Sequence, residues 1–309
     1  TQTYTGEFFQ LRTAHRADLA ESAFALPGSH EQIWIGGGRF DAPLDARDLG
    51  WRQLRPRAAD RDPTEPDLTF VYAPAMRKLR RSATAWVDGM FTPSFRATAA
   101  GGGGALASGS NALAPNGALS PGATLAAAAS EHLPTGFSDI SLRPNAYRWR
   151  LVGEREVLAP INGRQSGYPQ NAARNFGSSG LSLGSDRWDV RYAVVVEGTP
   201  LRGDHGFEAL TAYIDYQTQL PLYLITRRGA GRIAEIAIPV HRFSGDVADY
   251  PDDPGAERAL VFDPVAVAVY RAADGGSGWR RESYDVRSTP PSRAELREMT
   301  STDPLLRGR

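Results

Sequence analysis

The sequence predicts a mainly β protein with a strongly curved antiparallel sheet and few short helices. Runs that alternate apolar and polar residues recur along most of the 309 residues, as in half-buried strands. Glycine and proline separate these runs at hairpin spacing, and helical patterns are few. A meander of about ten or more strands must curl, so its concave face is either packed or holds a ligand. We expect a single domain over residues 1–309.

The composition excludes several classes of protein. Thirty-five basic and 35 acidic residues give a net charge of zero, so no overall basic field attracts nucleic acid. The chain has no cysteine, which excludes disulfides, thiolate metal sites and a cysteine nucleophile. No run approaches the ~18 apolar residues of a membrane-spanning helix, so we expect no transmembrane segment.

The first residues, Thr1–Gln10, lack the pattern of a signal peptide. We expect either that a signal peptide has been removed or that the chain begins inside a larger gene product.

The N-terminal part holds several β-type runs. They are residues 4–11, 32–35, 51–55 and 68–72, and 76–81 starts the return strand of a hairpin. Gly36–Gly38 is expected to be a turn between strands. Residues 14–26 favour one or two helical turns, because they are rich in good helix formers and end at Pro27.

Residues 97–139 differ from the rest of the chain in composition. Gly101–Gly104 and repeated alanine, serine and proline leave almost no charge and little apolar bulk. Such a segment cannot bury enough surface to order itself. We expect a long flexible insertion within the domain that acts as a lid.

Asn145–Asn162 has the strongest strand pattern of the chain. Its alternation places three large apolar residues on one face, namely Tyr147, Trp149 and Leu151. Arg148 and Arg150 fall on the other face, where we expect water or a partner. Gly153 interrupts the run and predicts a glycine bend in a curved strand.

The C-terminal half continues with strand patterns separated by loops. The expected strands are residues 188–197, 210–216, 222–227, 233–243, 265–270 and 279–287. Residues 163–184 and 246–257 are expected to be loops. The last part, 288–309, is expected to be a loosely ordered tail containing a short helix at 293–299.

Four segments together resemble a known bacterial family. They are Phe70–Ser82, Asn145–Asn162, Arg187–Thr199 and Ala212–Leu224, in that order, within a resemblance that extends over roughly residues 45 to 245. The family is domain of unknown function 1329 (DUF1329), whose members are often described as outer-membrane lipoprotein-sorting proteins. The resemblance implies a fold like the LolA/LolB/LppX group, a half-barrel with a hydrophobic concavity that binds acyl chains or other lipids.

The same resemblance implies a location and a partner. The protein is expected in the periplasm or at the outer-membrane periphery of a Gram-negative bacterium. Members of the family are often found beside transporters of the resistance-nodulation-division type, which makes such an inner-membrane transporter the expected partner.

The sequence offers no convincing active site. Its five histidines form neither an H-E-x-x-H nor an H-x-H motif, and no G-x-S-x-G elbow occurs. The glycine runs lack the lysine and serine or threonine of a P-loop. We therefore expect no enzymatic activity, no cofactor and no metal site, although ligands from distant strands would leave no spacing to detect.

The densest basic cluster is Arg77, Lys78, Arg80 and Arg81. Basic side chains often protect a solvated strand edge from pairing. The same cluster also suits a lipid head group, an anionic membrane or a partner protein.

Apolar and aromatic residues of the C-terminal strands are candidates to line the concavity. The candidates are Tyr147, Trp149, Leu151, Trp188, Tyr192, Val194, Tyr213, Tyr223, Ile236 and Ile238. They serve either as cavity lining for a hydrophobic ligand or as a packed core, because both show the same pattern. The two resulting functions are a carrier for a lipid-like ligand and a non-catalytic scaffold subunit of an envelope complex.

Overall fold

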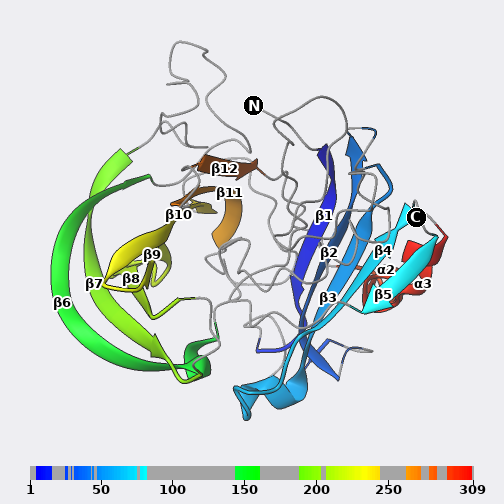
Figure 1. Ribbon diagram of the computed structural model, residues 1–309, viewed down its shortest axis with the longest axis horizontal. Helices are drawn as coiled ribbons and strands as arrows, with labels where there is room; N and C mark the ends of the chain where they lie inside the picture. Colours follow the sequence, from blue (N-terminus) through cyan, green and yellow to red (C-terminus); the bar gives the residue numbers. More distant parts are fainter. Residues whose placement is uncertain are drawn as a thin grey trace, which may run out of the picture. The chain divides into compact units, whose positions relative to one another are not determined.

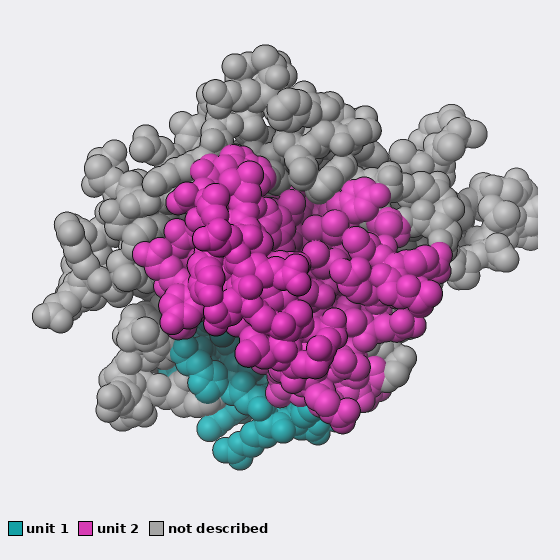
Figure 2. Space-filling model, turned by 90° about the vertical axis from the view of Figure 1, so that its left-hand side faces the viewer, with its two compact units in different colours: residues 1–135, 290–309 teal, residues 136–289 magenta. Residues whose placement is uncertain are grey.

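A computed structural model describes residues 5–15, 25–26, 29, 31–42, 44, 47–74, 77–81, 143–160, 188–202, 207–243, 262–272, 278–283 and 291–307. These residues belong to two compact units (Figures 1 and 2). Unit 1 comprises Thr1–Thr135 with Pro290–Arg309, and unit 2 comprises Gly136–Thr289. The predicted flexible insertion at 97–139 lies outside the described residues, and the single domain stays a prediction.

Unit 1 contains a five-stranded antiparallel sheet whose strands follow one another in sequence order. The strands are β1 (Thr5–Arg12), β2 (Gln32–Ala42), β3 (Gly50–Pro56), β4 (Leu68–Ala73) and β5 (Lys78–Arg81). A short 3₁₀ helix, η1 (Arg57–Asp60), follows β3.

Gly36–Gly38 lies in the middle of strand β2, so the predicted turn at this position is wrong. The neighbouring strands leave no room for side chains at these positions. A Cβ atom on Gly37 would stand 2.5 Å from the carbonyl oxygen of Trp51, and one on Gly38 would stand 2.6 Å from the ring of Phe8. The glycines therefore mark a close approach of neighbouring strands and side chains rather than a turn.

The last residues form two helices of unit 1, α2 (Arg293–Thr300) and α3 (Asp303–Leu306). Ser292 and Glu295 form a capping box that fixes the start of α2. Leu296 is buried against Ile35 and Leu54 of the sheet. These contacts correct the expectation of a loosely ordered tail and confirm the predicted short helix.

Unit 2 contains a seven-stranded antiparallel sheet, again in sequence order. Its strands are β6 (Tyr147–Pro160), β7 (Trp188–Pro200), β8 (Ala209–Asp215), β9 (Pro221–Arg228), β10 (Arg232–Phe243), β11 (Phe262–Arg271) and β12 (Gly278–Ser283), preceded by the 3₁₀ helix η3 (Pro144–Ala146). The long strands β6 and β7 bend into arcs (Figure 1). The mainly β, antiparallel class with few helices is confirmed, although the described strands form two sheets rather than one.

Strand β6 contains the predicted glycine bend as a β-bulge. Its register against β7 shifts between Leu151 and Gly153, where Leu151 pairs with Val196 and Gly153 with Val195. Gly153 has a φ of 149°, a backbone conformation that other residues rarely adopt. The extra residue exchanges the two faces of the strand for everything that follows it.

We expect Gly153→Ala to lower the free energy of unfolding by about 1–3 kcal/mol, because alanine is strained at this φ. No atom within 4 Å would meet the added Cβ, so the loss isolates backbone conformation. Urea unfolding followed by circular dichroism measures it.

Gly229→Ala is the matched control, since its Cβ would meet only Glu208 Oε1 at 3.9 Å and Gly229 is not among the positive-φ glycines of the described residues. The control is expected to change stability by less than ~0.5 kcal/mol. Equal losses in the two variants would contradict the assignment of strain to Gly153.

Candidate functional site

The register of the unit 2 sheet defines two faces. Face A carries Tyr147, Trp149 and Leu151 of β6, and face B carries Arg148 and Arg150. Tyr147 is buried, Trp149 is half-buried, and both arginines are exposed. The predicted alternation of this strand is therefore confirmed, with Leu151 exposed at the end of the apolar series.

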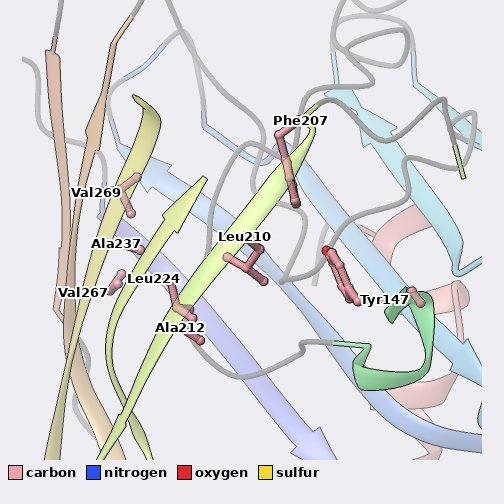
Figure 3. Packing of buried hydrophobic residues seen from close by; sticks show 9 residues of the cluster. Tyr147, Phe207, Leu210, Ala212, Leu224, Ala237, Val267 and Val269 are labelled. Atoms are coloured by element: carbon pink, nitrogen blue, oxygen red, sulfur yellow. The ribbon is translucent and has the colours of Figure 1, made fainter. Parts of the chain in front are cut away.

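One end of face A is covered by the main apolar cluster of unit 2 (Figure 3). The cluster is made of Ala146, Tyr147, Phe207, Leu210, Ala212, Leu224, Ala237, Val267 and Val269. The half-buried Trp149 packs against it and lies over Gly198, where a Cβ would stand 2.8 Å from the indole ring. Trp149 also donates a hydrogen bond from Nε1 to the carbonyl of Pro144 at 2.7 Å. This end of face A is a packed core.

Beyond the cluster, face A continues along β7 as an apolar strip. The β7 strip consists of Trp188, Val190, Tyr192, Val194 and Val196. Val196 and Val194 are half-buried, whereas Val190, Tyr192 and Trp188 are 59%, 46% and 39% exposed. The neighbouring strand β6 adds Leu158, cross-strand partner of Val190 and 58% exposed. The strip thus runs from the core to an open apolar surface.

The charged residues of β6, β7 and β8 divide unequally between the faces. Face B carries Arg148, Arg150, Arg155, Asp189, Arg191, Glu197 and Asp215. Face A carries only Glu154 and Glu156, paired across the strands with Val194 and Tyr192. The Tyr192 hydroxyl donates a hydrogen bond to Glu154 Oε2, and this bond raises the pKa of Tyr192. The open part of the β7 strip is therefore bordered by carboxylates.

The remaining cavity candidates lie on face B. Tyr213 and Tyr223 pair across β8 and β9, with ring centroids 6.0 Å apart. Ile236 and Ile238 of β10 pack beside Tyr223 in a small cluster with Ala268. The candidates predicted from sequence therefore do not share one wall, because the strand register places them on opposite faces. Whether either group meets a ligand stays a prediction.

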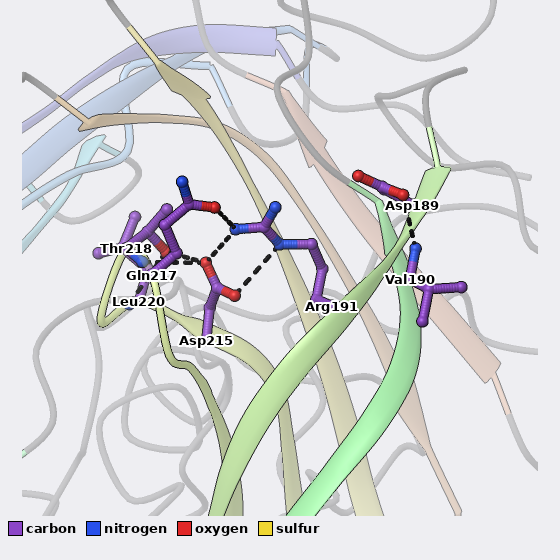
Figure 4. A network of polar contacts seen from close by, with 7 residues as sticks. All are labelled: Asp189, Val190, Arg191, Asp215, Gln217, Thr218 and Leu220. Atoms are coloured by element: carbon purple, nitrogen blue, oxygen red, sulfur yellow. Dashed lines mark hydrogen bonds and ion pairs between the residues drawn. The ribbon is translucent and has the colours of Figure 1, made fainter.

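Sequence reasoning missed a polar network on face B that joins β7 to the β8–β9 turn (Figure 4). Arg191 donates to both oxygens of Asp215, from Nε at 3.1 Å and from Nη2 at 2.8 Å. Asp215 also accepts from the backbone N–H and the hydroxyl of Thr218 at 3.0 and 2.6 Å. Arg191 and Asp215 lie 24 residues apart, so no local pattern announces their contact.

The network shifts the pKa values of both Asp215 and Arg191. Burial raises the pKa of Asp215, but the hydrogen bonds from Arg191 and Thr218 outweigh burial and hold it below its usual value. The hydrogen bond with Asp215 raises the pKa of Arg191 in turn. All partners of this network lie within the protein, so it fixes the turn rather than offering free groups for chemistry.

Residues 131–233 match the model of the DUF1329 family, which is described as a protein family of unknown function. The match confirms the resemblance for Asn145–Asn162, Arg187–Thr199 and Ala212–Leu224, whereas Phe70–Ser82 lies outside the matched residues. It extends from before β6 into the start of β10, so it includes the β7 strip and the Arg191–Asp215 network. Among curated proteins, none matches this chain.

Three solved structures are similar at low identity. A domain of the outer membrane lipoprotein-sorting type from Vibrio parahaemolyticus is 12% identical, with a TM-score of 0.48, over 88% of this chain and 77% of its own. A DUF1329 family protein from Desulfovibrio piger is 14% identical, with a TM-score of 0.40, over 83% and 73%. A LolA superfamily protein from Nitrosomonas europaea is 11% identical, with a TM-score of 0.35, over 83% and 77%.

The basic cluster lies at an edge of the unit 1 sheet. Lys78, Arg80 and Arg81 belong to β5, the last strand of that sheet, and Arg77 precedes it. The side chains of Arg77, Lys78 and Arg81 are exposed. This placement suits the protection of a strand edge, and a role as a head-group or partner patch stays a prediction.

The described histidines and carboxylates give no sign of a metal centre. Within the described ranges, no three or more His, Asp or Glu residues gather so that they hold an ion. His15 pairs with Asp60, with 2.6 Å between Nε2 and Oδ2, and burial lowers the pKa of His241 to about 4. No helix in the described parts of the chain is long and apolar enough to cross a membrane.

Replacing the carboxylate of Asp215 with an amide tests the network. We expect Asp215→Asn to lower the free energy of unfolding at pH 7 by about 2–3 kcal/mol, since it weakens several charge-assisted hydrogen bonds. The pKa of folded Asp215 is lowered, so its contribution is complete above the unfolded value of about 3.9 and is lost as the pH falls through the folded value. Urea unfolding at pH 7 and pH 3 measures both effects.

Glu197→Gln is the matched control on the same face. Glu197 pairs with Arg150 at 2.8 Å, but the Arg150 side chain is 69% exposed, so its loss is expected to cost less than ~1 kcal/mol. The assignment is wrong if the Asp215→Asn variant is no less stable than this control. It is also wrong if the Asp215→Asn variant loses as much stability between pH 7 and pH 3 as the unmodified protein.

Proposed function

We propose that this protein binds and carries a hydrophobic, lipid-like ligand in the periplasm or at the outer-membrane periphery of a Gram-negative bacterium. The observation that supports the proposal is the open part of the β7 strip, where Trp188, Val190 and Tyr192 are exposed side by side with Leu158. Grouped apolar side chains on a protein surface mark interaction sites, whereas isolated ones are ordinary.

The dimensions of the strip suit a long apolar chain. From Trp188 to Val196 it extends for about 26 Å at ~3.3 Å per residue, which is comparable with an extended acyl chain. Burying such a chain contributes roughly 0.8 kcal/mol per methylene group. The half-buried Val194 and Val196 continue the strip to the apolar cluster, so a ligand lying on the strip extends the packing of the core.

The location and the transporter partner rest on the family resemblance. A carrier in the envelope receives its ligand from one membrane or partner and releases it to another, which is compatible with a resistance-nodulation-division transporter. The proposed activity is binding without chemical conversion of the ligand.

A charge placed on the strip tests the proposal. We expect Val190→Asp to weaken the binding of the uncharged dye Nile red by at least about tenfold, because an ionised carboxylate in an apolar contact is costly. Val190 is 59% exposed, so the folded protein tolerates the change. Dye fluorescence during titration gives the affinity, and circular dichroism verifies the fold.

Thr199→Asp is the matched control, since Thr199 is an exposed residue of the same strand on face B. It adds the same charge and is expected to leave dye binding unchanged. If neither Nile red nor lipid extracted from the envelope binds the unmodified protein, the carrier function is wrong and the scaffold function takes its place. Equal dye affinity of the Val190 variant and the unmodified protein moves the ligand away from the β7 strip.

A further inference from the structure

We propose that the β7 strip selects cationic amphiphiles, which have a long apolar chain and an ammonium head group. This inference rests on the proposed function and adds the chemistry of the ligand's head group to it. It is drawn from the carboxylates that border the exposed end of the strip.

The first observation is the separation of charge between the two faces. On β6, β7 and β8 every arginine lies on face B, where Arg150 pairs with Glu197 and Arg191 with Asp215. Glu154 and Glu156 remain on face A, and these three strands bring no cation to that face. The strip therefore has a negative border without an internal counter-ion from its own strands.

The second observation is that aromatic rings lie beside these carboxylates. Tyr192 is the cross-strand partner of Glu156 and donates its hydroxyl to Glu154. Tyr216 lies edge to face with Tyr192, with ring centroids 5.9 Å apart, and is 65% exposed. Carboxylates attract a cation by charge, and the faces of aromatic rings attract it through their quadrupole.

The third observation concerns what holds the carboxylates in place. The hydrogen bond from Tyr192 orients Glu154 over the strip. Without the bulge at Gly153, strict alternation would place Glu154 and Glu156 on the face of Arg148 and Arg150. The backbone of β6 thus brings two exposed carboxylates to the apolar face, where they attract a cation that lies on the strip.

These features favour a long-chain ammonium over other occupants. The strip offers an apolar surface about 26 Å long and a carboxylate pair beside its exposed half. An anionic amphiphile of equal chain length fits the strip but is repelled by both glutamates. A partner polypeptide would need a cationic residue aligned with the same pair.

Head-group selectivity is measured with three dodecyl amphiphiles below their micelle concentrations. The probes are dodecyltrimethylammonium, dodecyl maltoside and dodecyl sulfate. The affinity of each is measured at low salt by its displacement of Nile red from the protein. We expect the cationic probe to bind about tenfold more tightly than the anionic one, with the neutral probe between them, and the preference to shrink as salt screens the exposed charges.

The test variant is Glu154→Gln/Glu156→Gln, which removes both charges and keeps an oxygen that accepts the Tyr192 hydroxyl. It is expected to lose the preference for the cationic probe while its affinity for the neutral probe is unchanged. The control variant is Asp189→Asn/Glu197→Gln, with the same change in net charge on face B. This control is expected to keep the preference.

The outcomes separate the two proposals. Binding of none of the three probes overturns the carrier function itself. Equal binding of all three head groups leaves the carrier function standing and overturns the cationic selectivity. A preference that survives in the Glu154→Gln/Glu156→Gln variant also overturns it, because the charge responsible then lies elsewhere.

Discussion

The arrangement of unit 2 depends on the β-bulge at Leu151–Gly153. A strand without a bulge keeps odd and even residues on opposite faces along its whole length. Here Gly153 adopts a φ of 149°, and the extra residue exchanges the faces halfway along the 14 residues of β6. The first half of the strand contributes Tyr147 and Trp149 to the core. The second half contributes Leu158 and two glutamates to the same face.

The bulge also explains how one strand serves two environments. Face B holds charges of both signs beside small apolar clusters, and its buried Asp215 accepts hydrogen bonds from Arg191 and Thr218. Face A holds the main apolar cluster at one end and exposed apolar side chains with two glutamates at the other. Exposed ion pairs stabilise little, and buried ones require hydrogen-bond partners. Both faces contribute to stability, and only the open end of face A, with Trp188, Val190 and Tyr192, is left available for binding.

The sequence predicted the strands well and their mutual register poorly. Alternation within Asn145–Asn162 correctly separated Trp149 from Arg150, because side-chain period is a local property. Trp149 and Tyr213, in contrast, lie on opposite faces, although both were expected in one wall. The face of a residue relative to residues on other strands depends on strand register and on bulges, which are not local properties. Gly36–Gly38 was predicted to be a turn because the sequence does not show the atoms of neighbouring strands that lie against these glycines. The Arg191–Asp215 contact is likewise non-local.

The edge position of β6 bears on which partners reach the β7 strip. Among the described strands of unit 2, β6 is the outermost beside β7. An edge strand next to exposed apolar side chains invites pairing with another chain, and charges and bulges prevent it. The strand has both devices, since Arg148, Arg155 and Glu156 are exposed along it and Gly153 interrupts its ladder. Pairing through the backbone is thus disfavoured, and access through the side chains of face A remains, which suits an amphiphile better than an added strand.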